Sequence, residues 1–184
     1  MQQEASTLRS LTLFVSSHFM FNVLGKLQSE ILMGDKHEAI LTMTQYTKIL
    51  RQACALSKND TNSMAEEGLF LEHYLQLEQR RFEEFSFTYH IIGFDSPSHH
   101  MAPFMIQPFV ELAVLSSLGA QNNVITLSYD KLQNTICIQS AMHNEGVSEK
   151  LEEKCETALQ RLQIYNHTYT KQSNHLSLNQ TINL

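Results

Sequence analysis

The sequence predicts an α+β protein in which an N-terminal antiparallel helical hairpin precedes a reduced α/β sandwich. Three observations lead to this prediction. Apolar residues up to position 56 recur at helical spacing, residues 57–63 (SKNDTNS) form a polar, turn-rich segment, and short β-rich stretches alternate with helical ones after it. We therefore expect a domain boundary near residue 60, with the hairpin in residues 1–60 and a mixed domain in residues 61–184.

The first helix is predicted over residues 5–33. No proline interrupts this stretch, and Gly34 follows it as a stop signal. Its apolar side chains are three to four residues apart, except for one step of five from Phe19 to Leu24, and this spacing is typical of one face of a helix. They are Leu8, Leu11, Val15, Phe19, Leu24, Leu27 and Ile31.

The second helix is predicted to begin after Asp35, which has the spacing of a capping box with Glu38, and to end near Leu56. Two helices alone cannot bury both of their apolar faces. We expect a second copy of the chain to complete a four-helix bundle, which makes the protein a homodimer. The alternative is that the hairpin packs against the rest of its own chain. The apolar positions of this helix are close to a heptad seam and comprise Ile40, Met43, Tyr46, Leu50 and Ala53.

Beyond the boundary, Ser63 and Glu66 form a second capping box, which predicts a helix that runs to about Glu84. The rest of the pattern predicts an antiparallel sheet covered on one face by helices. In order, we expect a strand at 85–92, a loop at 93–102, a helix at 107–118, strands at 124–129 and 135–140, a helix at 147–165 and a strand at 175–184.

Composition and charge exclude several classes of protein. Of the 184 residues, 42% are hydrophobic and 17% charged, which is typical of a folded globular chain, and the net charge of −6 argues against nucleic acid as a partner. No apolar run approaches the roughly 18 residues that a membrane span needs, and no signal-peptide pattern occurs. The three cysteines lack zinc or disulfide spacing. We expect a cytoplasmic protein, or the cytoplasmic portion of a sensor whose membrane segment lies outside this sequence.

Five short motifs follow one another between residues 8 and 165. The most specific is His18-Phe19-Met20-Phe21-Asn22, which resembles the P-H-F-L-F-N signature of the LytS/YehU-like sensor histidine kinases. The other four resemble further motifs of that family. They are Leu50-Arg51; Glu66-Glu67 with Tyr74-Leu75, Glu78 and Arg81-Phe82; Pro103 with Gln107-Pro108-Phe109-Val110-Glu111; and Arg161-Leu162 with Tyr165.

The resemblance implies that His18 is the phosphoacceptor. A neutral imidazole is a nucleophile near pH 7, and Asn22, one helical turn further on, can hold the ring's tautomer or contact the phosphoryl group. The alternative is a core histidine that a neighbour satisfies. Ser17 stands where the family has proline, which removes a helix kink before the histidine, and Phe14 stands where the family usually has glutamine.

Members of this family use ATP and magnesium, but the matching positions here depart from the pattern. Glu111 matches the glutamate of the ATP-binding N-box, whereas the magnesium-binding asparagine is replaced by Leu112. Asn144 or Glu145 stands near the expected adenine-binding aspartate, and no glycine follows residue 146 to form a phosphate lid. We expect no ATP, no other cofactor and no metal site. Glu111 is then interpreted either as a site residue or as a residual carboxylate at the surface or helix start.

Two further pairs are candidates for binding. His99-His100 can ligate a metal or simply be solvated in a loop, and Arg80-Arg81 can meet a phosphoryl group or form salt bridges on a helix face.

The resemblance implies two-component signalling, with a response-regulator receiver domain as partner and His18 passing a phosphoryl group to its aspartate. Three readings stay open. The chain is a histidine kinase domain with a divergent but working ATP site, an ATP-independent phosphotransferase of a phosphorelay, or a non-catalytic dimerisation and docking scaffold.

Overall fold

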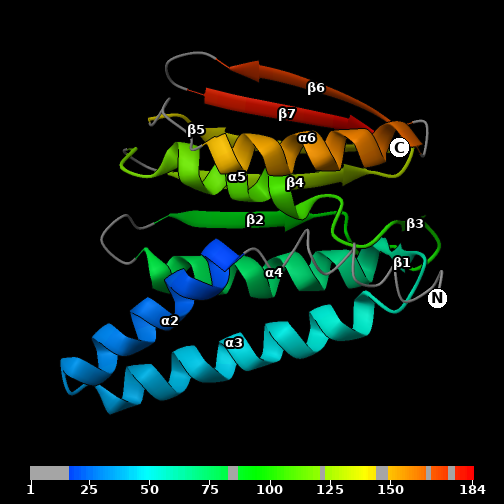
Figure 1. Ribbon diagram of the computed structural model, residues 1–184. Coiled ribbons are helices and arrows are strands. Elements are labelled where there is room, and N and C mark those ends of the chain that lie inside the picture. Colours follow the sequence, from blue (N-terminus) through cyan, green and yellow to red (C-terminus); the bar gives the residue numbers. More distant parts are fainter. Residues whose placement is uncertain (1–16, 83–86, 121–122, 144–148, 165–166, 174–176) are drawn as a thin grey trace.

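The computed structural model describes residues 17–82, 87–120, 123–143, 149–164, 167–173 and 177–184. Five helices and seven strands are described in these ranges (Figure 1). In chain order they are α2 (Ser17–Leu32), α3 (Lys36–Leu56), β1 (Asn62–Ser63), α4 (Met64–Arg81), β2 (Thr88–Ile92), β3 (His100–Met101), α5 (Gln107–Ser117), β4 (Val124–Asp130), β5 (Thr135–Ala141), α6 (Glu149–Ile164), β6 (Thr168–Ser173) and β7 (Ser177–Asn183).

Helices α2 and α3 form the predicted hairpin. Gly34 adopts a φ of 79° in the turn, a conformation that costs glycine little. The Asp35 side chain accepts a hydrogen bond from the Glu38 backbone N–H at 3.1 Å, which satisfies one free donor at the start of α3. The predicted start of the second helix is therefore confirmed. The part of the first predicted helix before Ser17 lies outside the described residues.

Helix α4 begins at the predicted capping box. The Ser63 hydroxyl accepts from the Glu66 N–H at 3.3 Å, and the Glu66 carboxylate accepts from the Ser63 N–H at 2.8 Å. The helix ends at Arg81, before the predicted end near Glu84. The Phe82 N–H still donates to the Glu78 carbonyl, but Phe82 leaves the helical conformation with φ −111° and ψ 42°.

The main sheet has the strand order β2-β4-β5-β7-β6. It is mixed and not antiparallel as predicted, because β2 pairs parallel to β4 and is connected to it through α5. The sequence analysis missed β6, whose polar sequence TYTKQS lies exposed at the edge of the sheet and has no apolar alternation. It also missed the short pair of strands β1 and β3. Strand β3 lies inside the loop that was predicted at 93–102 and pairs with β1 over two residues.

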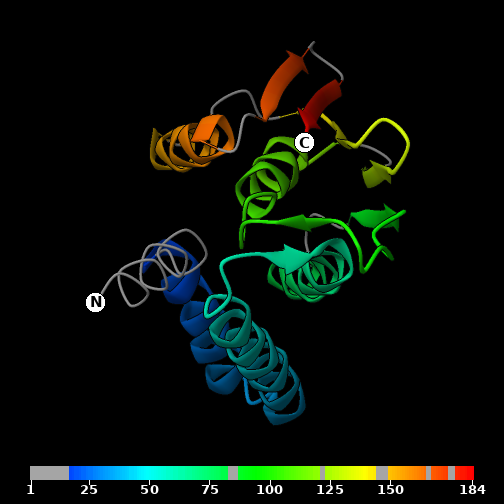
Figure 2. The same cartoon turned by 90° about the vertical axis from the view of Figure 1, so that its right-hand side faces the viewer.

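Helices α5 and α6 cover one face of this sheet (Figures 1 and 2), and α4 lies between the hairpin and β2 (Figure 1). Their inward side chains and every second residue of the central strands form one continuous core. The fully buried members include Phe70, Leu71 and Leu75 of α4, Phe109 and Val110 of α5, Ile125 and Leu127 of β4, and Ile136 and Ile138 of β5.

Candidate functional site

His18 is the second residue of α2, and its side chain lies outside what the structure describes. The buried stripe of α2 is formed by Val23, Leu27 and Glu30. Positions three and seven residues after the histidine share its helix face. These are Phe21, which is 70% exposed, and Gly25, which is also exposed. Asn22, one turn after His18, is half-buried.

Helix α3 carries two apolar faces, not the single seam that the sequence predicted. One face is buried and packs towards α4, and the other, with Ile40 and Met43, is largely exposed. The predicted seam therefore combined residues of the buried face, such as Tyr46 and Ala53, with residues of the exposed face. The alternative that the hairpin packs on its own chain therefore holds for one face of α3. The buried face comprises Ala39, Thr42, Tyr46, Ile49, Ala53 and Leu56.

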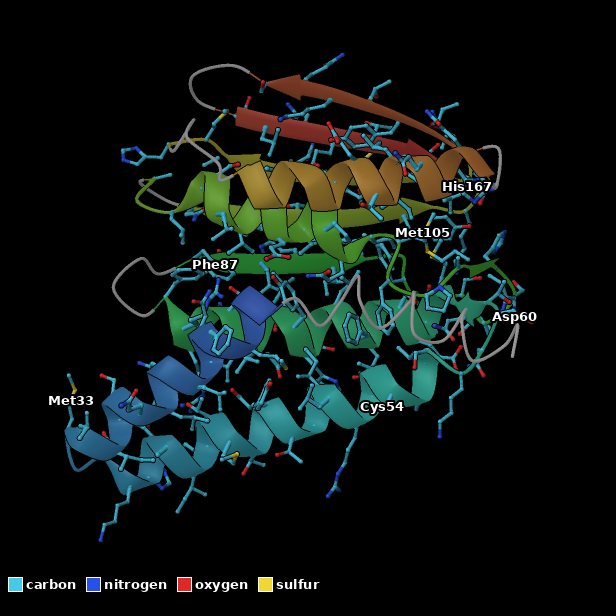
Figure 3. The ribbon with its side chains drawn as sticks, in the orientation of Figure 1. Met33, Cys54, Asp60, Phe87, Met105 and His167 are labelled. Atoms are coloured by element: carbon cyan, nitrogen blue, oxygen red, sulfur yellow. The ribbon has the colours of Figure 1, made fainter. Side chains whose placement is uncertain are left out.

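The tip of the hairpin is apolar and exposed. Ile31, Leu32 and Met33 are 64%, 79% and 82% exposed, and Met33 points away from the rest of the molecule (Figure 3). Together with Phe21, Leu24, Ile40 and Met43 they form what we call the outer hairpin face. Several large exposed apolar side chains on one hairpin are typical of a protein–protein contact.

Glu111 is only 4% exposed, so it is not the surface carboxylate that one interpretation proposed. Its Oε2 accepts a hydrogen bond from Gln107 Nε2 at 3.0 Å, one turn earlier on α5. Burial raises the pKa of Tyr74 of α4 well above its usual value, and the Glu78 and Glu111 carboxylates raise this pKa further. Glu111 is therefore a buried carboxylate that interacts with Gln107 of its own helix and electrostatically with Tyr74.

Leu112 stands where the resemblance places a magnesium ligand, and it packs among apolar side chains. It is 6% exposed and clusters with Leu178 of β7, with Leu115 and Cys155 against them. The Cys155 thiol also contacts the Pro108 carbonyl at 3.7 Å, which holds α6 on α5. This position offers no oxygen to a cation.

Asn144 and Glu145 lie outside the described residues. The chain just before them is attached to the end of α5, because the His143 N–H donates to the Ser116 carbonyl at 2.8 Å. Gly119, with a φ of +89°, lies so close to the His143 ring that a Cβ there would be 2.8 Å from Cδ2. The end of β5 therefore packs directly on the end of α5.

Sequence reasoning missed two buried polar groups that hold α5 in place. Glu67 is fully buried and accepts hydrogen bonds from Asn62 Nδ2 at 3.1 Å and from the Phe104 N–H at 3.2 Å. Phe104 has a φ of 58°, which is uncommon for a bulky residue and requires such support. Gln180 of β7 donates from Nε2 to the Phe109 carbonyl at 2.9 Å. The only signal in the sequence for these roles was a polar residue on an otherwise apolar face: a carboxylate, Glu67, on α4 and an amide, Gln180, on β7.

The histidine and arginine pairs have structural partners. His99 Nδ1 lies 2.9 Å from Ser96 Oγ, and its ring meets Tyr129 edge-on. Within the described ranges, no group of three or more His, Cys, Asp or Glu side chains is placed to hold a metal. Arg80 pairs with Glu38 of α3 and Arg81 with Glu78 at 2.6 Å, so the salt-bridge interpretation is confirmed for both. No described helix is both long and apolar enough to cross a membrane.

Fold and site together define a helical hairpin that carries the histidine motif near the start of α2, joined to a mixed α/β part. Residues 6–86 match the family model described as "Histidine kinase". Over this part the chain is similar to the histidine kinase family, and the relatives below make it similar to LytS-type sensor proteins.

"Sensor protein LytS" of Staphylococcus haemolyticus is 34% identical over 110 residues, which are 58% of this chain and 18% of the relative. "Sensor protein LytS" of Staphylococcus saprophyticus is 28% identical over 158 residues, which are 83% of this chain and 26% of the relative. The chain thus spans about a quarter or less of these relatives. The solved Acinetobacter baumannii histidine kinase AdeS is 11% identical with a TM-score of 0.48, covering 89% of this chain and 92% of that one.

Proposed function

We propose that this chain is a two-component signalling module in which His18 accepts a phosphoryl group and passes it to an aspartate of a response-regulator receiver domain. The observation that carries the proposal is the family match over residues 6–86, a range that includes His18 and the motif around it. The positions three and seven residues further along the same helix face, Phe21 and Gly25, are exposed. An exposed face lets a second domain approach an imidazole. Asn22 is the proposed positioning partner, one turn away.

The proposed chemistry is a reversible transfer between nitrogen and oxygen. The neutral imidazole nitrogen forms a bond to phosphorus as the bond to the aspartyl oxygen breaks, and the carboxylate leaves. The reverse step regenerates the free imidazole and the aspartyl phosphate. The second imidazole nitrogen keeps its proton, so the transfer needs no redox partner.

We further propose that the chain does not use ATP as donor and holds neither ATP nor magnesium. Magnesium requires oxygen ligands in near-octahedral geometry. Leu112, at the matching position, is packed against Leu178 and Cys155, which supports the proposal. Glu111 interacts with Gln107 and electrostatically with Tyr74, so it too is occupied structurally. Asn144 stays a proposed relic of the adenine-binding position.

The proposed working unit is a cytoplasmic homodimer, divided into a phosphoacceptor hairpin of residues 1–60 and a degenerate ATPase-like domain of residues 61–184. The outer hairpin face supports this proposal, because a second hairpin would cover side chains that one chain leaves in water.

The test compares two radiolabelled donors, ATP with magnesium and a phosphorylated receiver domain, on the wild type, His18→Ala and His37→Ala. His37 is exposed on the same hairpin and is the matched control. We expect acid-labile label from the receiver on the wild type and on His37→Ala, and none on His18→Ala. Label from ATP on His18 would show a working kinase, and no label from either donor would show a scaffold.

A further inference from the structure

The two faces of the five-stranded sheet differ in chemistry. On the face towards α5, the β5 side chains of Ile136 and Ile138 are fully buried. Side chains alternate along a strand, so Thr135, Cys137 and Gln139 of β5 lie on the opposite face. Helices α5 and α6 cover only the first of these faces (Figure 2). The second face is therefore open wherever the structure describes it.

The register of the three inner strands fixes which side chains are neighbours on this open face. Two rows run from β4 across β5 to β7, and we call their residues the outer sheet face. Each member carries a hydroxyl, an amide or a thiol, each is half-buried or exposed, and none is charged. The rows are Thr126, Gln139 and Asn179, and Ser128, Cys137 and Thr181.

The missing charge on the outer sheet face is typical of a contact and not of a surface that stays in water. The chain has 13 lysines and arginines and 19 aspartates and glutamates, yet none of them lies in these two rows. Charged residues are depleted in the centre of protein–protein interfaces, because a charge that is buried without a partner is costly. The composition of the face therefore indicates that another molecule covers it.

The net charge of the chain favours a second copy as that molecule. At −6, two copies repel each other where their acidic surfaces meet, and an uncharged face is where they can approach at the lowest cost. Hydroxyl and carboxamide groups both donate and accept hydrogen bonds. The face is therefore complementary to itself, as a two-fold contact between identical surfaces requires.

We propose that the outer sheet face binds the same face of a second copy of this chain. Strand β5 is the central strand of the sheet, so a two-fold axis along β5 covers the largest part of the face. In this arrangement Gln139 of each copy lies next to the axis, opposite Gln139 of the other copy.

The size of the sheet predicts a weak contact. With strands about 4.8 Å apart and a rise of about 3.3 Å per residue, the five strands present roughly 500 Å² per copy, or about 1,000 Å² in all. Stable interfaces bury about 1,200–2,000 Å². We therefore expect an association that depends strongly on protein concentration.

The turn between β4 and β5 supplies an apolar anchor at one end of the face. Leu132 in this turn is 98% exposed, and the Asp130 carboxylate holds the turn by accepting from the Leu132 N–H at 2.8 Å and the Gln133 N–H at 3.1 Å. A hollow of about 610 Å³ beside it is lined in part by Ser128 and Cys137. The proposed axis brings both turns to the same end of the pair, so Leu132 of one copy lies near the hollow of the other.

The experiment is sedimentation of the full chain at protein concentrations up to about 1 mM, the range of weak specific contacts. Gln139→Glu keeps the shape of the side chain but places two negative charges opposite each other at the axis. Gln160→Glu makes the same change at an exposed position of α6, over the other face, and is the matched control. We expect Gln139→Glu to weaken association at least about tenfold and Gln160→Glu to leave it at the wild-type value. Leu132→Ser should also weaken it and replaces Gln139→Glu if that variant fails to fold.

Ile40→Asp on the outer hairpin face separates this contact from the proposed hairpin dimer, on which the inference does not rest. The hairpin and β6 lie at opposite ends of the molecule (Figure 1). Ile40→Asp should still associate through the sheet, and adding Gln139→Glu should leave a monomer. An Ile40→Asp variant that is monomeric at every concentration would overturn the proposal and leave the face to another partner. Equal weakening by Gln139→Glu and Gln160→Glu would overturn it too. If only the hairpin dimer is wrong, Ile40→Asp will match the wild type while Gln139→Glu still weakens association.

Discussion

The hairpin and the sheet domain differ in how completely they cover their apolar side chains. In the sheet domain, most large apolar side chains of α4, α5, β4 and β5 are buried to 0–6% exposure, and a helix layer covers one face of the sheet (Figure 2). In the hairpin, Phe21, Ile31, Leu32, Met33 and Ile40 are all at least 64% exposed. The sheet domain is complete within one chain, whereas the hairpin has more apolar surface than this chain can cover.

The same contrast holds for buried polar groups. Among the described residues, the hairpin interior contains one buried carboxylate, Glu30, which accepts from the Thr42 hydroxyl at 3.1 Å and lies 3.6 Å from Lys26. The described part of the sheet domain contains three, Glu67, Glu78 and Glu111. Polar networks specify a unique arrangement when each member is satisfied. The domain is therefore the rigid region and the hairpin the region that can adopt a new partner.

The largest expected effect separates the two faces of α3. Ile49→Ala removes a fully buried side chain between α3 and α4 and should lower the free energy of unfolding by about 4 kcal/mol. Ile40→Ala, 64% exposed, should change it by less than about 0.5 kcal/mol at low protein concentration. Urea denaturation measures both, and sedimentation should show that only Ile40→Ala weakens the proposed dimer. Similar losses for both variants would contradict the distinction between the faces.

Glu67→Ala tests the rigid region. It leaves the Asn62 amide and the Phe104 N–H buried without their acceptor, and should cost about 3 kcal/mol. Glu72→Ala, at an exposed position on the same helix, is the control and should have little effect. Equal urea midpoints for the two variants would show that Phe104 does not need this support.

The two helix caps give a smaller contrast. Ser63→Ala removes a reciprocal, part-buried cap from α4 and should cost about 1 kcal/mol, whereas Asp35→Ala removes one exposed bond from α3 and should cost about 0.5 kcal/mol. Thermal unfolding, monitored by circular dichroism, measures the loss of stability in both variants. A larger loss at Asp35 would mean that the hairpin depends more on local signals than the domain does.

The smallest expected effect is on how stability changes at acidic pH. Hydrogen bonds from the Ser63 N–H and hydroxyl lower the pKa of Glu66. A lowered native pKa contributes stability that is complete above the unfolded value of about 4.3 and is lost as the pH falls through the native pKa. The wild type should therefore lose more stability between about pH 5 and pH 3 than Ser63→Ala. Urea midpoints across this range measure the difference, and parallel curves would exclude Glu66 as a contributor.

Much of the architecture was predictable because its signals are local. The caps at Asp35 and Ser63 lie within three residues of the groups that they bond, so the starts of α3 and α4 were predicted correctly. Strand β6 was not predicted, because its polar sequence has no apolar alternation. The parallel pairing of β2 was not predicted either, because it depends on β4, which is distant in the sequence. The electrostatic interaction of Glu111 with Tyr74 was equally hidden.

The sequence by itself determined where α3 and α4 begin, the class of fold and the histidine motif, because each depends on residues a few positions apart. Only the tertiary structure decided that Leu112 meets Leu178 and Cys155, and that Glu111 interacts electrostatically with Tyr74. It also decided which face of α3 is covered. These outcomes depend on side chains that are distant in sequence, and spacing along the chain carries no record of which of them meet.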